Sequence, residues 1–170
     1  MVTIQKVIQR METSAVSVKT MKELMPDGVD VLVYEQLKGK QRKQLFKNKR
    51  GIVVLIPKEG TKSGHFIALL PRKNHIEYFS SLGNSFESEL KMLKQKQTYF
   101  HTLLGSDYIY NRVKLQSGDY SIKTCAQYVF ARMILYKLKL REFVEIFKRN
   151  VDLETPDEIV SLMSVLHFLR

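Results

Sequence analysis

The only cysteine of the chain, Cys125, stands where a thiol could act as a nucleophile. The four residues from Thr124 to Gln127 have the Thr-x-x-Gln spacing of a capping box, which predicts Thr124 as the N-cap of a helix. Cys125 would then be the first helical residue, where the positive end of the helix dipole lowers the pKa of a thiol toward the nucleophilic thiolate. The alternative is a small buried side chain without chemistry, but such a cysteine would more naturally lie in the middle of the apolar face.

A cysteine nucleophile needs a base, and histidine is the usual one. Of the four histidines, His65 directly follows Gly64 and opens an apolar segment predicted as a strand. A side chain at the junction of a strand and a loop is both rigidly held and accessible, as a catalytic group must be. The other three lie in a predicted hairpin turn, a basic helix and an apolar C-terminal helix, and they are His75, His101 and His167.

The elements that must position these side chains are strands and helices grouped in separate parts of the sequence. Apolar, β-branched runs predict strands over 52–56, 65–70, 76–79 and 108–115. Helical spacing of apolar residues predicts helices over 18–25, 29–37, 87–104, 124–138, 141–148 and 156–170. Because the two types are segregated, the sequence predicts an α+β fold whose mostly antiparallel or mixed sheet packs between helices.

The bulk composition limits the classes of protein to which the chain can belong. Its 170 residues fit a single domain, which we expect to span 1–170. One cysteine permits no internal disulfide, fits a reducing compartment and excludes a cysteine-rich zinc site, so we expect neither a metal nor another cofactor. No apolar run is long enough for a membrane span, and the N-terminal segment lacks the apolar stretch of a secretory signal.

The charge of the chain indicates a polyanionic partner. Its 28 Lys and Arg residues outnumber 17 Asp and Glu residues, which gives a net charge of +11. Such a domain attracts DNA or RNA, and sequence-independent contacts with phosphates need only a basic surface. The basic residues concentrate in 38–50 and 91–96, and further ones are Arg132, Lys137 and Lys139. The alternative is that this charge only keeps the protein soluble.

Three segments, in this order, resemble the signature of the adenain-like and SUMO-protease-like cysteine peptidases. They are Gly64-His65-Phe66, the stretch from Tyr78 to Gly83, and the stretch from Gln116 to Cys125. In that superfamily, which has a papain-like arrangement, a histidine precedes an aromatic residue and a strand then delivers an acid. A glutamine follows, before the nucleophilic cysteine that starts a central helix. The compact viral members look most similar, namely adenovirus-type maturation proteases and their relatives in virophages and polinton-like elements.

The resemblance implies a role for four side chains. His65 matches the general base, Cys125 the nucleophile, and Gln116 the residue that helps to form the oxyanion hole. Ser80 falls at the position of the acid that orients the histidine. Because serine carries no charge, the resemblance implies a Cys–His dyad with a polar helper. Glu77 is the nearest acid on the same strand, but its odd spacing from Ser80 points it to the opposite face.

These roles predict a cysteine endopeptidase that cuts capsid or other structural precursor proteins during particle maturation. The resemblance also implies DNA as a partner of the basic surface, and a location in the virion and in the viral factory of the host cytoplasm. Two alternatives stay open. One is a protease that removes SUMO or another ubiquitin-like modifier, which shares the catalytic parts. The other is a non-enzymatic, basic nucleic-acid-binding protein in which Cys125 is incidental.

Overall fold

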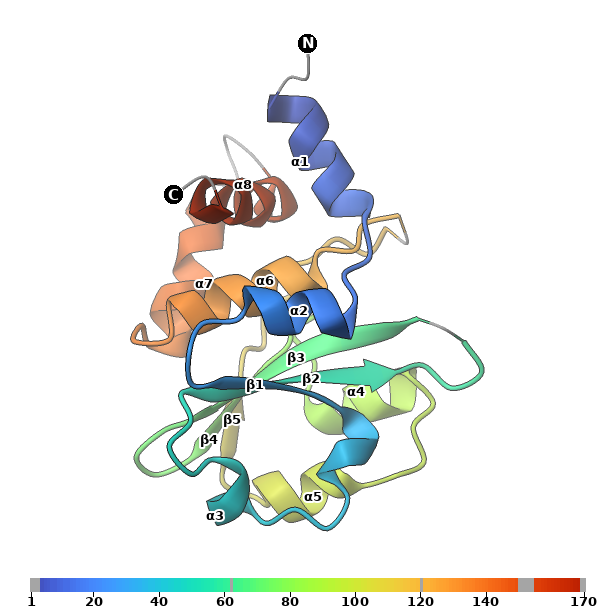
Figure 1. Ribbon diagram of the computed structural model, residues 1–170, viewed down its shortest axis with the longest axis vertical. Coiled ribbons are helices and arrows are strands. Elements are labelled where there is room, and N and C mark those ends of the chain that lie inside the picture. The colour runs from blue at the N-terminus through green and yellow to red at the C-terminus, as the bar shows by residue number, and fades with distance from the viewer. Residues whose placement is uncertain (1–3, 62, 120, 150–154, 169–170) are drawn as a thin grey trace.

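The computed structural model describes residues 4–61, 63–119, 121–149 and 155–168, and within them a five-stranded sheet lies between two layers of helices (Figure 1). The strand order is β1-β2-β3-β4-β5, with β2, β3 and β4 antiparallel and the two outer strands parallel to their neighbours. The α+β class with a mixed sheet between helices is therefore confirmed. The strands are β1 (Val29–Val33), β2 (Gly51–Pro57), β3 (Gly64–Pro71), β4 (Ile76–Phe79) and β5 (Tyr108–Tyr110).

Both faces of the sheet are buried, which explains why its central strands read as continuous apolar runs. Alternate side chains along each strand enter different cores, because successive residues of a strand point to opposite faces. In β3, Phe66 and Ala68 enter one core, whereas Ile67 and Leu69 enter the other.

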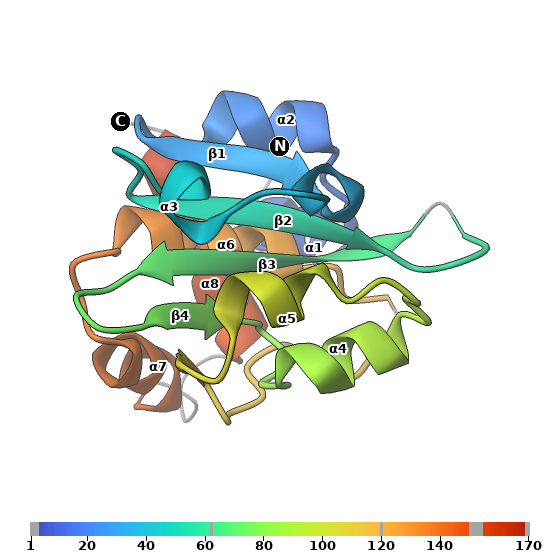
Figure 2. The same ribbon diagram turned by 90° about the horizontal axis from the view of Figure 1, so that it is seen from below.

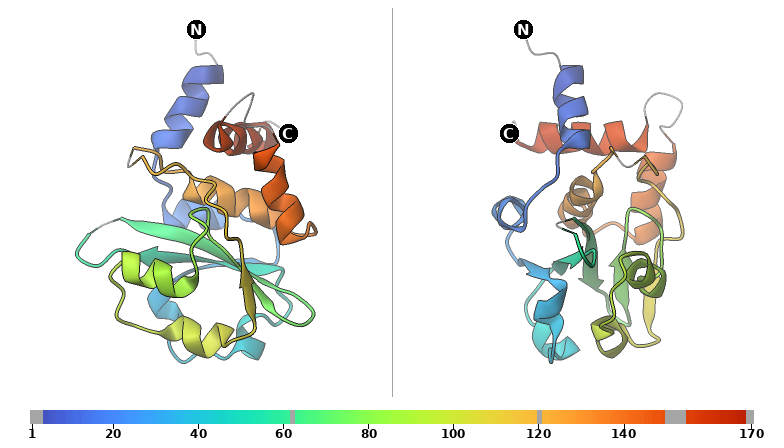
Figure 3. Two further views of the ribbon diagram at one scale, coloured as in Figure 1. Left: turned by 180° about the vertical axis from the view of Figure 1, so that it is seen from behind. Right: turned by 90° about the vertical axis from the view of Figure 1, so that its right-hand side faces the viewer.

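One helical layer covers the first face of the sheet, and a second layer covers the opposite face (Figures 1 and 2). The first layer contains α2 (Val18–Leu24), α6 (Cys125–Ile134), α7 (Leu140–Lys148) and α8 (Pro156–Phe168), and α6 packs directly on β3. Helix α1 (Ile4–Thr13) lies against α8 on the side of the molecule away from α3 and α5 (Figure 3). The second layer contains the 3-10 helix η1 (Tyr34–Leu37), α3 (Arg42–Leu45), α4 (Phe86–Met92) and α5 (Tyr99–Leu104).

The helix predicted over 29–37 is wrong. This segment forms β1 and then η1, and each residue of β1 is paired with a residue of β2, as Val31 is with Val53. The pairing is parallel and joins segments far apart in sequence, so local spacing of apolar residues cannot reveal it.

The helix predicted over 87–104 is two helices, α4 and α5. The chain leaves α4 through Lys94, whose φ of 57° is left-handed, and the Gln95 amide then donates to the Leu90 carbonyl at 2.8 Å. The predicted strand over 108–115 ends at Tyr110, and the helix predicted over 124–138 ends at Ile134. The last helix is present as α8, and residues 169 and 170 of that prediction lie outside the described residues.

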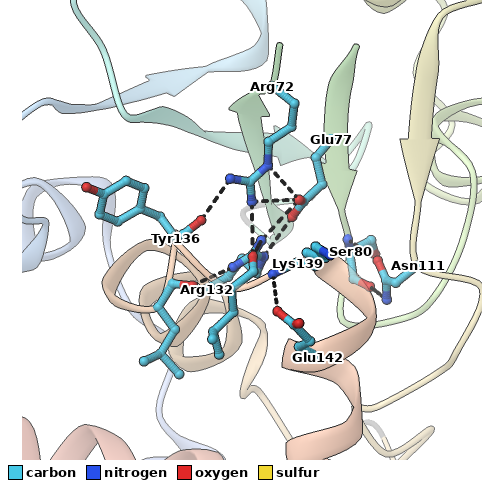
Figure 4. A network of polar contacts seen from close by, with 10 residues as sticks. Arg72, Glu77, Ser80, Asn111, Arg132, Tyr136, Lys139 and Glu142 are labelled. Carbon is cyan, nitrogen blue, oxygen red and sulfur yellow. Dashed lines mark hydrogen bonds and ion pairs between the residues drawn. The ribbon is translucent and has the colours of Figure 1, made fainter. Parts of the chain in front are cut away.

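A buried ion network fastens α6 to the hairpin of β3 and β4 (Figure 4). The carboxylate of Glu77 accepts from Arg132 Nε at 2.7 Å and from Arg72 Nη2 at 2.7 Å. Arg132 is fully buried, and its remaining N–H groups donate to the carbonyls of Leu135 and Leu138 at 2.8 and 2.9 Å. Glu77 therefore points to α6, as its spacing from Ser80 predicts, and its charge is neutralised there.

Candidate active site

His65 lies at the beginning of β3 and is held from the neighbouring strand. Gly64 permits the close approach of β3 to β2 at this point, because a Cβ there would lie 2.6 Å from the carbonyl oxygen of Ile56. The His65 side chain is almost fully buried, at 7% exposure. Its Nε2 atom lies 3.1 Å from Ser80 Oγ, within hydrogen-bond distance. The structure thus brings together two of the predicted site residues.

Ser80 directly follows β4, and its backbone is fixed on both sides. The Asn111 side chain accepts from the Ser80 amide at 3.1 Å and donates to the Ser80 carbonyl at 2.7 Å. The Leu82 amide donates to Ser80 Oγ at 3.2 Å. The turn that follows needs Gly83, because its φ is 70° and an added Cβ would lie 2.6 Å from the Val113 backbone. The hydroxyl is therefore presented to His65 from a rigid segment.

Glu89 is a third side chain at the His65 ring that the sequence analysis did not identify. It belongs to α4, is fully buried, and places Oε1 3.3 Å from His65 Nε2. Within the described residues, neither carboxylate oxygen of Glu89 makes a hydrogen bond of good geometry. Its face of the helix is otherwise apolar and carries Phe86, Leu90 and Leu93. An acid within this apolar stripe is the one feature of the sequence that could have pointed to Glu89.

Burial shifts the pKa values of Glu89 and His65 in the directions that favour the neutral form of each side chain. The pKa of Glu89 is raised to about 7 by burial, and the side chains of Ser80 and Asn84 offset the rise only in part. The pKa of His65 is lowered to about 4, also by burial. Above pH 7 the pair is consequently a carboxylate beside a neutral imidazole.

Cys125 is the first residue of α6, as predicted, and lies next to β3. The backbone of Phe66, the residue after His65, hydrogen-bonds the Cys125 sulfur, and so does the backbone of Ala126. The expected lowering of the thiol pKa is wrong. Loss of surrounding water raises the pKa of Cys125, the nearby Glu89 raises it further, and the backbone hydrogen bonds to the sulfur do not compensate. The thiol of Cys125 is therefore neutral at rest.

The capping box predicted for Thr124 and Gln127 is also wrong. Thr124 occupies the N-cap position, but its hydroxyl donates to Asp157 Oδ1 of α8 instead of accepting from the helix. The Gln127 side chain donates to the Met11 carbonyl at 2.8 Å. A tertiary contact with a distant acid has therefore replaced the local cap.

Asp157 holds both ends of the loop that precedes Cys125. Besides accepting from Thr124, it accepts from the Ser117 amide through Oδ2 at 2.8 Å. It is nearly fully buried, and burial raises its pKa. Asp157 thus supports the loop that precedes Cys125, a role that the sequence does not predict.

Gln116 lies between the Ser80 segment and the loop that precedes Cys125. Its Oε1 accepts from Ser81 Oγ at 2.8 Å, and its Nε2 donates to the Ile122 carbonyl at 3.2 Å. These contacts fix the amide plane and use one of the two N–H groups on Nε2. The second N–H group can donate to a developing oxyanion.

The pieces of a Cys–His site thus converge at one end of β3. Within the described residues, no hydrogen bond or ion pair joins the thiol of Cys125 to the imidazole of His65. The contacts of the ring to Ser80 and Glu89 use Nε2, so a proton on Nε2 leaves the lone pair of a base on Nδ1.

Within the described residues, no three His, Cys, Asp or Glu side chains are grouped to hold a metal ion. None of the helices in the described ranges has the length and apolar character needed to span a bilayer.

Comparisons with known proteins give one relative by sequence and a distant match by structure. No protein-family model matches the chain. Uncharacterized protein V9 of Sputnik virophage is 26% identical over 161 residues, covering 84% of this chain and 90% of that protein. A structure of the SUMO protease Ulp1, with its catalytic cysteine oxidised to a sulfinic acid, aligns with 94% of this chain and 77% of its own, at 13% identity and a TM-score of 0.35. The chain is therefore similar to a viral protein, and the structural match is too weak to determine an activity.

Proposed function

We propose that this protein is a cysteine endopeptidase with Cys125 as nucleophile and His65 as base. The observation that carries the proposal is the convergence of three segments that are far apart in the sequence. The ring of His65 is held at Nε2 by Ser80 and lies one residue from Phe66, whose backbone contacts the sulfur of Cys125 at the start of α6. A thiol at a helix N-terminus, next to the strand that holds an oriented imidazole, is suited to acyl transfer.

The reaction proceeds by attack of Cys125 on a peptide carbonyl. His65 Nδ1 takes the thiol proton as the S–C bond forms, and Gln116 with backbone N–H groups stabilises the oxyanion. The imidazolium returns its proton to the amine as the C–N bond breaks. Water then attacks the thioester, again through His65, and releases the acid and the free thiol. Because thiol and imidazole are both neutral at rest, the proton moves during attack rather than before it.

We assign the substrates to structural precursor proteins of a virus particle, cut in the virion or in the viral factory. Support for a viral setting comes from the similarity to the Sputnik virophage protein over most of both chains. Removal of a ubiquitin-like modifier uses the same chemistry, so cleavage of modifier fusions and of capsid precursors must be compared side by side.

The test is cleavage of such substrates by the purified protein and by its Cys125→Ala variant, with folding checked by circular dichroism. The variant should cut nothing while it keeps the fold. Because Cys125 is the only thiol, alkylation by iodoacetamide modifies one position, and the loss of activity should follow the fraction modified. Continued cleavage by Cys125→Ala, or full activity after complete alkylation, would exclude the proposed nucleophile.

We also propose that the basic surface binds DNA without base preference. The net charge of +11 is the supporting observation. Each phosphate contact releases counterions, so the affinity should fall steeply between about 50 and 200 mM salt, by roughly 1,000-fold or more for about six contacts. Negligible binding of a DNA duplex at the lower salt concentration would exclude DNA as the partner and indicate that the basic surface binds an acidic protein instead.

A further inference from the structure

We propose that Glu89 is the positioning residue of this site, and that its carboxylate supplies the negative charge that Ser80 lacks. The inference rests on the proposed peptidase function, because it assigns a role at the His65 ring. Glu89 reaches the ring from α4, whereas the acid of the resembling peptidases comes from the strand position that Ser80 occupies. The charge is therefore present, but it is delivered by a different element.

The geometry places Glu89 on the same ring nitrogen as Ser80. Its Oε1 is 3.3 Å from His65 Nε2, and Ser80 Oγ is 3.1 Å from the same atom. Ser80 can orient the ring by a hydrogen bond but cannot stabilise a positive charge on it. A buried carboxylate at this distance can do so, because opposite charges attract strongly where water is excluded.

Packing alone does not explain a glutamate at this position. Phe86, Leu90 and Leu93 on the same face of α4 all enter the core, and Glu89 is fully buried among them. A buried carboxylate whose loss of water is only partly offset by Ser80 and Asn84 destabilises a fold, and an apolar side chain would avoid the cost. Strongly perturbed acids of this kind are typical of functional sites.

The titratable groups that face Glu89 come from three elements, and one of them can accept a proton. Tyr78 on β4 is fully buried, and both its burial and Glu89 raise its pKa, so it stays neutral. Cys125 on α6 is likewise neutral at rest. His65 on β3 is the remaining group, and it becomes positive when Cys125 transfers its proton. The charge of Glu89 is consequently used at His65.

The experiment compares cleavage by wild type, Glu89→Gln and the control Glu87→Gln. Glu87 belongs to the same helix but is exposed and bonds to Tyr108 Oη at 2.9 Å. Glu89→Gln keeps the shape and removes the charge, so kcat should fall roughly 10- to 1,000-fold with little change in KM. Glu87→Gln should retain kcat within about twofold. Full activity in Glu89→Gln would overturn the proposal.

The pH profile separates a charge effect from a structural one. Glu89 must be ionised to act, so wild-type kcat should rise with pH through about 7, where the carboxyl titrates. In Glu89→Gln this rise should be absent from the residual activity. A profile that keeps the same rise in Glu89→Gln would show that another group causes it. Should the glutamine variant fail to fold, Glu89→Met offers the same length in an apolar form.

Nuclear magnetic resonance of His65 keeps the proposal testable even without a cleaved substrate. In the wild type, the pair of Glu89 and His65 should take up one proton near pH 7. In Glu89→Gln, the ring should take up a proton only at a lower pH, because burial lowers the pKa of His65 and no carboxylate opposes this effect. If wild type cleaves nothing but shows this coupling, the peptidase proposal fails while the pairing of Glu89 with His65 stands. If the ring titrates identically in both proteins, Glu89 does not act on it.

Discussion

The side chain of Asn111 forms two hydrogen bonds with the backbone of Ser80, accepting from its amide and donating to its carbonyl (Figure 4). Asn111 also donates to the Val113 carbonyl at 3.1 Å. An amide is the side chain suited to this arrangement, because it carries a donor and an acceptor on one planar group. The Ser80 hydroxyl is therefore aimed at His65 by a residue that contacts neither the ring nor the thiol.

Replacement of Asn111 by aspartate should test this support. Aspartate can still accept from the Ser80 amide, but its second oxygen would face the carbonyls of Ser80 and Val113. We expect a stability loss of about 1–3 kcal/mol from the unpaired buried groups. We also expect a fall in kcat of roughly 10-fold, since the ring of His65 is less well oriented. Thermal unfolding and peptide cleavage measure the two effects, and Asn74→Asp in the exposed hairpin turn is the control. Unchanged kcat in Asn111→Asp would mean that Ser80 needs no such support.

Ser80→Asp should have opposite effects in two backgrounds. In the wild type it would bury a second carboxylate beside Glu89, and two like charges at one imidazole disfavour each other. We therefore expect kcat to fall, although the substitution restores the acid of the resembling peptidases. In Glu89→Gln, the same substitution returns one carboxylate to Nε2, and kcat should recover at least in part.

The cleavage rates of the two single variants and the double variant form a cycle that checks this expectation. Ser80→Ala in the wild type is the control, and it should reduce kcat less than His65→Ala does. A gain in kcat from Ser80→Asp in the wild type would show that Glu89 supplies no charge to the ring.

The sequence predicts the order of the site residues but not how the fold supports them. His65 is recognisable because it opens an apolar run and Cys125 because it opens a helix, whereas Ser80 is found only through the resemblance to the peptidase signature. Glu89 is not recognisable in this way, because its contact with His65 depends on how α4 packs against β3. Asp157 likewise reaches Thr124 only through the docking of α8, and this contact removes the helix cap that local spacing predicts.

The same distinction explains the errors in the fold. The three central strands are apolar almost throughout, so they are evident from the sequence. In contrast, β1 is an edge strand whose parallel pairing decides its conformation, and β5, predicted as a longer strand, includes only the residues that pair with β4. The segment over 87–104 has helical spacing on both sides of Lys94, and only the left-handed backbone of that residue separates the helices. The local spacing of apolar residues cannot reveal strand pairings or helix breaks that depend on distant parts of the chain.

Glu89→Gln should stabilise the protein at alkaline pH while it reduces activity. The pKa of Glu89 is raised from 4.5 to about 7, so the folded state binds the proton more tightly than the unfolded state. Its ionisation therefore costs stability that grows as the pH rises from about 4.5 to 7, by up to about 3 kcal/mol. Thermal unfolding should show a higher Tm for Glu89→Gln at pH 8, and a smaller difference at pH 5. Glu87→Gln is the control and should gain no stability at pH 8. A Tm at pH 8 that is lower than that of wild type would indicate that the carboxylate is favourably bound.

Asp157 and Thr124 should act as a coupled pair that holds the loop that precedes Cys125. Asp157→Ala would leave the buried Thr124 hydroxyl without its acceptor, which costs about 1–3 kcal/mol, whereas the Ser117 amide belongs to an exposed residue and can bond to water instead. Loss of either residue frees the start of α6, so we expect kcat to fall roughly 10-fold while iodoacetamide still modifies Cys125. Thr124→Val keeps the shape of the side chain but removes its hydroxyl. The double variant Asp157→Ala/Thr124→Val should lose no more kcat and stability than Asp157→Ala alone, because the contact between the two residues is lost only once. Glu158→Gln, which perturbs the capping of α8 at Thr155 without touching the loop, is the matched control and should leave kcat unchanged. Strictly additive losses in the double variant would show that α8 supports the site by packing rather than through this contact.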